Sequence, residues 1–174
     1  MDRSEDAPDI RLAESAVDYE AFGEVCRAYF AWCRARYSEM PWFVDEVFGQ
    51  QSFDAELTVL AAKYGPPAGR TMLAVRDGQV VAGGAYHQLA DGVCELKRLY
   101  VTDQARGLGL GRKLTDALTA SARADGYRLM RLDTAHLLKE AISMYDSMGF
   151  HRIPPYRDYP ARLMPYLVFM ERPL

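Results

Sequence analysis

The chain has 174 residues, of which 49% are hydrophobic and 26% are charged, a balance typical of one globular domain with a full core. Its formal net charge of −3 gives no indication of nucleic acid or an anionic membrane as a partner. The three cysteines, Cys26, Cys33 and Cys94, form no metal-type pair with histidine, so we expect reduced thiols in a cytoplasmic protein without a metal site. No apolar run is long enough to span a bilayer.

The first third of the chain predicts a short strand followed by helices. Residues 1–8 are polar and acidic, which predicts a frayed tail and excludes a signal peptide. A strand is expected over residues 10–12, then a helix over 19–37 that Asp18 caps and the Pro41-Trp42 segment breaks. A second helix is expected over 53–64, ended by the Gly and Pro residues of 65–69.

The middle of the chain predicts an antiparallel meander. Strands are expected over residues 71–75, 79–89 and 93–101, joined by turns at Asp77-Gly78 and Asp91-Gly92. Gly83-Gly84 allows a bend or bulge in the second of these strands.

The last third alternates helices and strands. Residues 110–126 predict an amphipathic helix, 127–134 a strand, 138–148 a helix closed by Gly149, and 150–153 and 167–171 two more strands. The order predicts a single α/β layered domain over residues 1–174, with a strand–loop–helix–strand crossover in its middle.

A glycine-rich loop, RGLGLGR at residues 106–112, joins the meander to the helix that follows it. Glycines at a helix N-terminus leave backbone N–H groups exposed, which suits a phosphate or pyrophosphate. The loop is not a Walker A motif, because no Lys-Ser/Thr pair follows at the required spacing. It is also a poor Rossmann fingerprint, because its third glycine is misplaced and the preceding strand arrives through hairpins.

The sequence around this loop resembles the GNAT superfamily of N-acetyltransferases. Residues 94–101, CELKRLYV, precede Arg106, Gly109 and Gly111, which match the Arg/Gln-x-x-Gly-x-Gly/Ala signature of its acetyl-coenzyme A site. Residues 141–150, AISMYDSMGF, resemble its second signature, a helix that carries a tyrosine and ends in Gly-Phe. The resemblance runs from residue 71 to the C-terminus and is weak over the first 65 residues.

The resemblance implies a mixed, mostly antiparallel sheet with splayed central strands, and acetyl-coenzyme A as cosubstrate. The pyrophosphate is then expected on the backbone of Arg106, Gly107, Leu108, Gly109, Leu110 and Gly111, with added charge from Arg112. The pantetheine arm is expected beside Leu99, Tyr100 and Val101, in the gap between splayed strands. Lys97 and Arg98 would add charge if they point outward, and an ordinary solvated strand face is the equal alternative.

Glu95 is the residue that the sequence favours as general base. Strand alternation predicts that it shares a face with Leu99 and Val101, and apolar neighbours would raise its pKa by desolvation. The alternative is a structural pair with Arg98 or Arg131. Cys94 should point to the opposite face, which argues against a ping-pong route through an acyl-enzyme.

Tyr145 is the expected general acid, since the tyrosine of this family helix lies near the coenzyme sulfur, although a core tyrosine is the alternative. A backbone N–H near Leu99 would polarise the thioester carbonyl. The chain departs from the family at Leu138, where many members carry an Asn that holds the coenzyme arm. Of the three histidines, His87 is the one most worth mutating, because it ends a strand and could face the acceptor.

The acceptor is expected to be a primary amine of a small molecule or a protein, with neither nucleic acid nor membrane as a partner. Aromatic side chains could line its site, with one wall from the N-terminal part and one from the C-terminal part: Tyr29, Trp32, Tyr37, Trp42, Phe43, Tyr156 and Tyr159. The sequence is compatible with a homodimer and does not fix the oligomeric state. The main alternative is a non-catalytic acyl-coenzyme A sensor, and an NTPase is disfavoured by the missing Lys-Ser/Thr.

Overall fold

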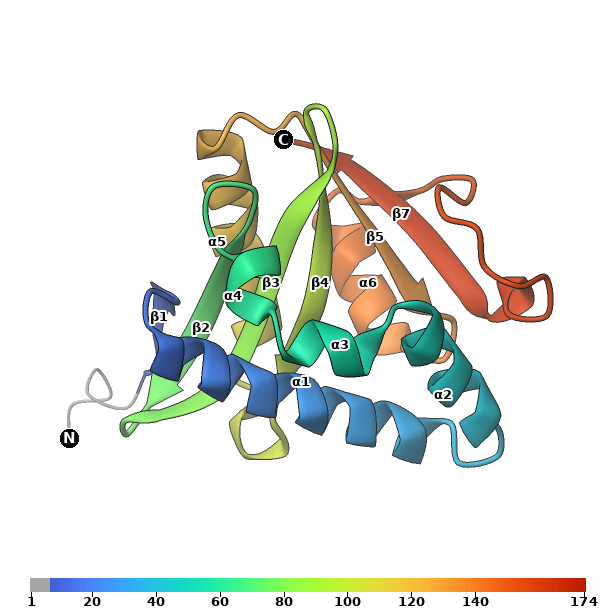
Figure 1. The fold of residues 1–174 in the computed structure, drawn as a ribbon, viewed down its shortest axis with the longest axis horizontal. Helices are drawn as coiled ribbons and strands as arrows, with labels where there is room; N and C mark the ends of the chain where they lie inside the picture. Colours follow the sequence, from blue (N-terminus) through green and yellow to red (C-terminus); the bar gives the residue numbers. More distant parts are fainter. Residues whose placement is uncertain (1–6) are drawn as a thin grey trace.

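The computed structural model describes residues 7–174, which form a seven-stranded sheet covered by helices on both faces (Figure 1). The strand order is β1-β2-β3-β4-β5-β7-β6, and β4 with β5 is the one parallel pair among the described strands. This is the predicted layered α/β fold with a mostly antiparallel sheet. The expected frayed tail falls largely on residues 1–6, which lie outside the described part.

The strands agree closely with the sequence prediction. They are β1 Asp9–Leu12, β2 Arg70–Arg76, β3 Gln79–Ala90, β4 Val93–Val101, β5 Leu129–Ala135, β6 His151–Arg152 and β7 Leu167–Pro173. The meander closes through Asp77, at φ 51°, and Gly78, at φ 71°, as a two-residue turn of this kind requires. Two short 3₁₀ helices, η1 Asp103–Ala105 and η2 Met164–Tyr166, lie in the connections.

The N-terminal helices differ from the prediction in three places. Helix α1 spans Ala16–Arg36, and its N-cap is Ser15, whose side chain forms a reciprocal capping box with Asp18. Pro41 does end the first helical region, but it also begins α2 (Pro41–Gln50), because proline is well tolerated at the first helical position. The expected helix over 53–64 is two short ones, α3 Phe53–Leu57 and α4 Leu60–Tyr64.

Helices α1 to α4 cover one face of the sheet, and α5 (Leu110–Ala124) and α6 (Lys139–Ser147) cover the other. Figure 1 shows α1 crossing in front of the strands with α5 and α6 behind them. Buried Phe22, Phe43 and Tyr64 fill the first interface, while Leu114 and Leu118 of α5 pack into the second. Both faces of β4 are therefore buried, and its side chains are sorted between two cores.

Candidate active site

The two central strands separate at the middle of the sheet. Strand β4 pairs with β5 only from Val93 to Glu95, so the rest of β4 has no partner on that edge among the described strands. A bulge bends β4 just beyond this point, where Gly84 of β3 faces both Arg98 and Leu99, and Arg98 takes a left-handed φ of 58°. The splay that the family resemblance implied is confirmed.

The bulge overturns the predicted alternation along β4. Leu99 and Val101 pack towards α5, whereas Tyr100 packs against Tyr29 and Trp32 on the α1 side. Glu95 also lies on the α1 side of the sheet, where it contacts His87. The prediction that Glu95 shares a face with Leu99 and Val101 is therefore wrong. One additional residue in a strand moves every later side chain to the other face, and simple alternation cannot anticipate it.

The glycine-rich loop forms an open cradle of backbone amides at the start of α5. Gly107 and Gly109 have φ of 81° and 70°, and Gly109 is the N-cap of α5. Within residues 7–174, the amides of 107–112 donate to no other group, and no side chain caps this helix end. Such a helix N-terminus suits a bound phosphate group, as the sequence predicted.

The side chains of the loop have separate roles. Arg106 lies over the rings of Trp32 and Tyr100, 5.1 and 5.9 Å from the ring centroids. Arg112 donates to Ser147 on α6. Leu110, the first residue of α5, is buried against β2 and β3 and can offer only its amide, while Leu108 is exposed.

A large cavity of about 400 Å³ opens beside this loop. It runs from Arg106 and Gly111, past the β4 residues Leu99, Tyr100 and Val101, to Tyr145 on α6. Leu138, where many family members carry Asn, contributes an apolar wall. The cavity therefore follows the path that the resemblance implied for the coenzyme arm.

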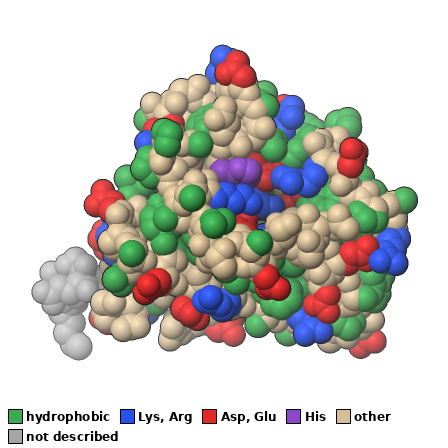
Figure 2. All heavy atoms as spheres, in the orientation of Figure 1, with side chains coloured by type: hydrophobic (Ala, Val, Ile, Leu, Met, Phe, Trp, Pro, Cys, Tyr) green, Lys and Arg blue, Asp and Glu red, His purple; other side chains and the backbone are tan. Residues whose placement is uncertain are grey.

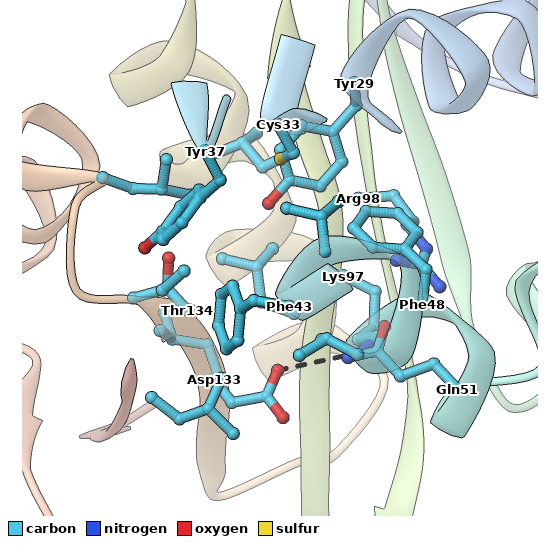
Figure 3. Close-up of a pocket in the computed structure, with 18 of the residues that line it drawn as sticks. Tyr29, Cys33, Tyr37, Phe43, Phe48, Gln51, Lys97, Arg98, Asp133 and Thr134 are labelled. Carbon is cyan, nitrogen blue, oxygen red and sulfur yellow. Dashed lines mark ion pairs between the residues drawn. The ribbon is translucent and has the colours of Figure 1, made fainter. Parts of the chain in front are cut away.

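A smaller cavity of about 70 Å³ continues into the split between β4 and β5 (Figure 3). Its lining includes Gln51, Lys97, Arg98 and Asp133 together with apolar side chains of α1 and α2. Five residues line both cavities: Tyr29, Leu99, Thr134, Leu138 and Tyr145. The two spaces therefore meet at the bulge of β4, beside Tyr145.

Tyr145 lies where the cavities meet and is 6% exposed. Its ring packs against Phe150 at 5.4 Å, and its hydroxyl makes no hydrogen bond in the described part of the chain. Burial raises the pKa of Tyr145, so the phenol keeps its proton at neutral pH. Tyr145 therefore fits both alternatives: its ring packs in the core, and the residue also lines the two cavities with its hydroxyl unpaired in the described structure.

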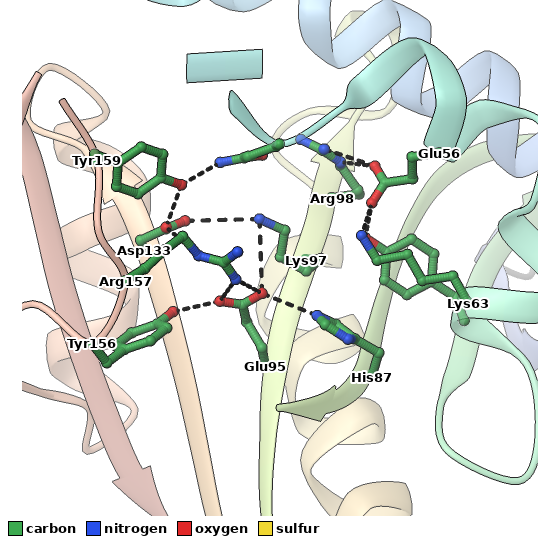
Figure 4. Close-up of polar contacts among 12 residues, drawn as sticks. Glu56, Lys63, His87, Glu95, Lys97, Arg98, Asp133, Tyr156, Arg157 and Tyr159 are labelled. Atoms are coloured by element: carbon green, nitrogen blue, oxygen red, sulfur yellow. Dashed lines mark hydrogen bonds and ion pairs between the residues drawn. The ribbon is translucent and has the colours of Figure 1, made fainter. Parts of the chain in front are cut away.

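Glu95 is the centre of a buried charge network (Figure 4). It accepts from Arg157 Nη2 on both carboxylate oxygens at 2.6 Å and from Tyr156 at 2.8 Å, and His87 Nε2 lies 3.0 Å from its Oε1. Burial alone would raise the pKa of Glu95, but His87, Lys97 and Arg157 outweigh it and hold this pKa well below its usual range. The expected raised pKa is wrong, because the neighbours of Glu95 are cations and not apolar groups.

The alternative partners considered for Glu95 bind other carboxylates. Arg98 binds Glu56 of α3 at 2.7 Å, and Arg131 binds Glu171 of β7 at 2.7 Å. Lys97 and Arg98 point inward, at 7% and 5% exposure, so neither an outward role at the phosphate nor a solvated face describes them.

The other sequence candidates divide between the cavities and the surface. Tyr29, Trp32, Tyr37 and Phe43 line one or both cavities, whereas Trp42 is 43% exposed and lines neither. Tyr156 and Tyr159 join the charge network. His136 contacts Tyr37, and His151 is exposed. Cys94 is buried towards α5 and α6, away from Glu95 as predicted, and burial raises its pKa to about 12.

Several site residues have no motif in the sequence that marks them. Glu56 comes from α3, Gln51 from the C-terminal end of α2, Asp133 from β5, and Arg157 from the connection between β6 and β7. Gln51 donates to Tyr159, which donates to Asp133 at 2.8 Å, while Gln51 Oε1 is buried without a partner in the described residues. Of these residues, only Asp133 could have been identified from the sequence, because it lies on the predicted strand beside the split.

Two further properties of the described residues concern metals and membranes. Across residues 7–174, no three His, Cys, Asp or Glu side chains are grouped so as to hold a metal ion. No helix in that part of the chain is both long enough and apolar enough to cross a bilayer.

Comparisons with known proteins agree with this architecture. A model of the acetyltransferase (GNAT) family matches residues 24–150. An N-acetyltransferase of Schizosaccharomyces pombe is 41% identical over 124 residues, covering 70% of this chain and 74% of that protein. An acetyltransferase from Streptococcus agalactiae superposes with a TM-score of 0.73 at 20% identity, over 97% of this chain and 99% of that one.

The PaiA N-acetyltransferase of Thermoplasma acidophilum, solved in complex with coenzyme A, superposes with a TM-score of 0.68 at 18% identity, over 95% and 99% of the two chains. At such identities the two structural likenesses show the fold alone. The family match and the yeast relative go further: this chain belongs to the acetyltransferase (GNAT) family and is an acyltransferase.

Proposed function

We propose that this protein transfers an acetyl group from acetyl-coenzyme A to a primary amine, by direct attack while both substrates are bound. The observation that carries the proposal is the meeting of the two cavities at Leu99 and Tyr145. One cavity starts at an anion cradle, and the other lies in the split between β4 and β5. A donor and an acceptor that enter from opposite sides would bring their reacting atoms together there.

The donor side fits coenzyme A in charge and shape. The amides of 107–112 would hold the pyrophosphate, with Arg106 and Arg112 beside it. The edge of β4 beyond Glu95 lacks a strand partner in the described structure, so its backbone is free to pair with the pantetheine amides. The 400 Å³ cavity gives this arm a path towards Tyr145.

The transfer needs one proton removed and one supplied. The amine nitrogen bonds to the thioester carbonyl carbon, the carbon–sulfur bond breaks, and the sulfur leaves with the electron pair. Tyr145 is proposed to give its hydroxyl proton to that sulfur, and a backbone N–H near Leu99 to donate to the carbonyl oxygen. Tyr145 then regains a proton from water.

Two carboxylates are candidates to receive the amine proton. Glu95 is the choice from the sequence, but three neighbours occupy its oxygens and its pKa is lowered. Asp133 lines the smaller cavity between β4 and β5, which we call the acceptor cavity, and its Oδ1 accepts no hydrogen bond in the described residues. We therefore assign the first proton transfer to Asp133 and give Glu95 the task of holding Arg157 and Lys97 in place.

The proposal is tested by a screen of primary amines with acetyl-coenzyme A, read by free thiol release and by mass of the product. Tyr145→Phe should lower kcat about a hundredfold or more and leave coenzyme A affinity, measured by calorimetry, unchanged. The fold should tolerate this change, because the hydroxyl that it removes makes no hydrogen bond in the described structure. Binding of acetyl-coenzyme A without consumption across the panel would instead favour an acyl-coenzyme A sensor.

A further inference from the structure

Lys97 and Asp133 lie beside each other in the lining of the acceptor cavity, and neither the Lys97 ammonium nor Asp133 Oδ1 makes a hydrogen bond in the described structure. Both side chains line the cavity and are almost fully buried, at 6% and 7% exposure. Lys97 Nζ lies 3.9 Å from Asp133 Oδ1 and 3.9 Å from Glu95 Oε1, so it has two opposite charges nearby but no hydrogen bond in the described structure. Figure 3 shows the pair with the cavity lining around it.

An ammonium with three donors and a carboxylate oxygen without a donor are costly to bury unless a ligand completes them. The rest of the network does not complete them. Arg157 binds Glu95 and lies 3.7 Å from Asp133 Oδ2, which accepts from Tyr159, so Asp133 Oδ1 and the Lys97 ammonium are left without a hydrogen bond in the described structure. The buried Oε1 of Gln51 is a third group in this cavity without a partner in the described residues. The cavity therefore offers one site for an anion directly beside acceptors for a cation.

We propose that the acceptor is an amine with a carboxylate on the neighbouring carbon, an α-amino acid, held with its amine at Asp133 and its carboxylate at Lys97. This inference rests on the proposed acetyl transfer and specifies its substrate class. An amine and a carboxylate on one carbon lie side by side, as do the two side chains that would bind them. The same contact with Asp133 places the amine against the group assigned to take its proton.

The approach to the network is cationic, which suits an acid-bearing substrate. The Arg157 side chain is 33% exposed, whereas its partner Glu95 has no exposed surface. Figure 2 shows Lys or Arg side chains and a histidine gathered in a hollow at the middle of this face. The charge that an incoming molecule meets first is therefore positive. The small cavity volume and its apolar lining from α2 favour amino acids with compact side chains.

The test compares matched pairs in which only the carboxylate differs. Glycine, alanine and serine are compared with their carboxamides, and kcat/KM is measured by thiol release. We expect each acid to exceed its amide by about tenfold or more, since the amide leaves Lys97 without its charged partner. α-Amino amides are less basic than the acids and hold more free amine at neutral pH, so basicity cannot produce this preference.

Lys97→Met should reduce the acid-to-amide ratio to near one. Because both substrates are measured on the same variant, any loss of folded enzyme cancels in the ratio. Lys63→Met is the matched control: Lys63 binds Glu56 at 2.5 Å and lines neither cavity, so this variant should keep the wild-type ratio.

Three outcomes would overturn the inference, and they differ in what else they affect. If the wild type accepts amides as well as acids, the α-amino acid inference is wrong and the proposed acetyl transfer still stands. A preference that survives in Lys97→Met, or disappears equally in Lys63→Met, would show that the acid does not bind Lys97. Absence of turnover with every acid, amide and simple amine, with coenzyme A still bound, would remove the proposed function as well.

Discussion

Glu56 binds Arg98, the residue in the bulge where β4 separates from β5. Arg98 sits in the bulge of β4 with a φ of 58°. Its Nε donates to Glu56 Oε2 at 2.7 Å, and its Nη2 lies in ion-pair range of the same oxygen, also at 2.7 Å. Burial alone would raise the pKa of Glu56, but the charge of Arg98 and hydrogen bonds from Lys63 and Tyr64 outweigh it and lower the pKa to about 2. Glu56→Gln keeps the shape of this side chain and removes its charge.

The size of the effect follows from that pKa. A fall from the ordinary 4.5 to about 2 corresponds to roughly 3 kcal/mol of stabilisation. Breaking a buried ion pair from one side costs about 3–5 kcal/mol, so both estimates agree. Because the pKa is lower in the folded state, the stabilisation is complete above pH 4.5 and is lost as the pH falls towards 2.

Urea unfolding of the wild type and Glu56→Gln at pH 7 and pH 4 measures this effect. We expect a difference of roughly 3 kcal/mol at pH 7 that shrinks by roughly 1 kcal/mol at pH 4. Glu24→Gln is the control, since Glu24 is exposed and pairs only with Arg27 on the same helix, and it should be close to neutral. A loss below about 1 kcal/mol at pH 7, or one that does not change with pH, would show that Glu56 does not hold Arg98 as described.

Three further predictions concern the loop, the carboxylates and the thiols. Gly109→Ala and Gly78→Ala both place alanine at a φ near 70° with open space around it, so each should cost about 1 kcal/mol, but only Gly109→Ala should also weaken coenzyme A binding in calorimetry. Equal losses of coenzyme A binding in the two variants would show that the loop amides do not bind the pyrophosphate. Glu95→Gln should lower the unfolding free energy by releasing Arg157, whereas Asp133→Asn should lower kcat in steady-state kinetics; a fall in kcat in Glu95→Gln at unchanged stability would restore Glu95 as the base. The three cysteines are buried and burial raises the pKa of each to about 12, so the folded protein should resist iodoacetamide at pH 8 and Cys94→Ala should keep its turnover; rapid labelling or an inactive variant would contradict this.

The fold from residue 70 onward can be predicted from the sequence, because each element there has a local signal. The strand boundaries, the Asp77-Gly78 turn and the glycines before α5 each depend on a few consecutive residues, and the structure agrees with them, whereas the alternation along β4 fails at its bulge. The N-terminal part lacks such signals, so the sequence predicts only a helix break at Pro41, whereas in the structure this residue also begins α2. A proline is compatible with either end of a helix, and the buried face of α2 decides between them.

The glycine-rich loop and the position of its backbone amides could be predicted from the sequence for the same reason, and the lining of the smaller cavity could not. The cradle is made of consecutive residues, whereas the acceptor cavity combines Gln51, Lys97 and Asp133 from three distant parts of the chain. The environment of Glu95 depends on Arg157, 62 residues later in a connection without regular structure. Only the fold brings that cation to the carboxylate, where it joins His87 and Lys97 in lowering the pKa of Glu95 against the effect of burial.

The bulge at Arg98 links these separate observations. Without the additional residue, Leu99 would share a face with Lys97, and β4 could remain paired with β5 beyond Glu95, which would close the gap where the cavities meet. The left-handed backbone at Arg98 is unfavourable for a side chain of its size, so it needs support from elsewhere. That support is Glu56 of α3, from the N-terminal part of the chain. The part of the chain that supplies Gln51 to the acceptor cavity thus also holds open the split in which acceptor and donor would meet.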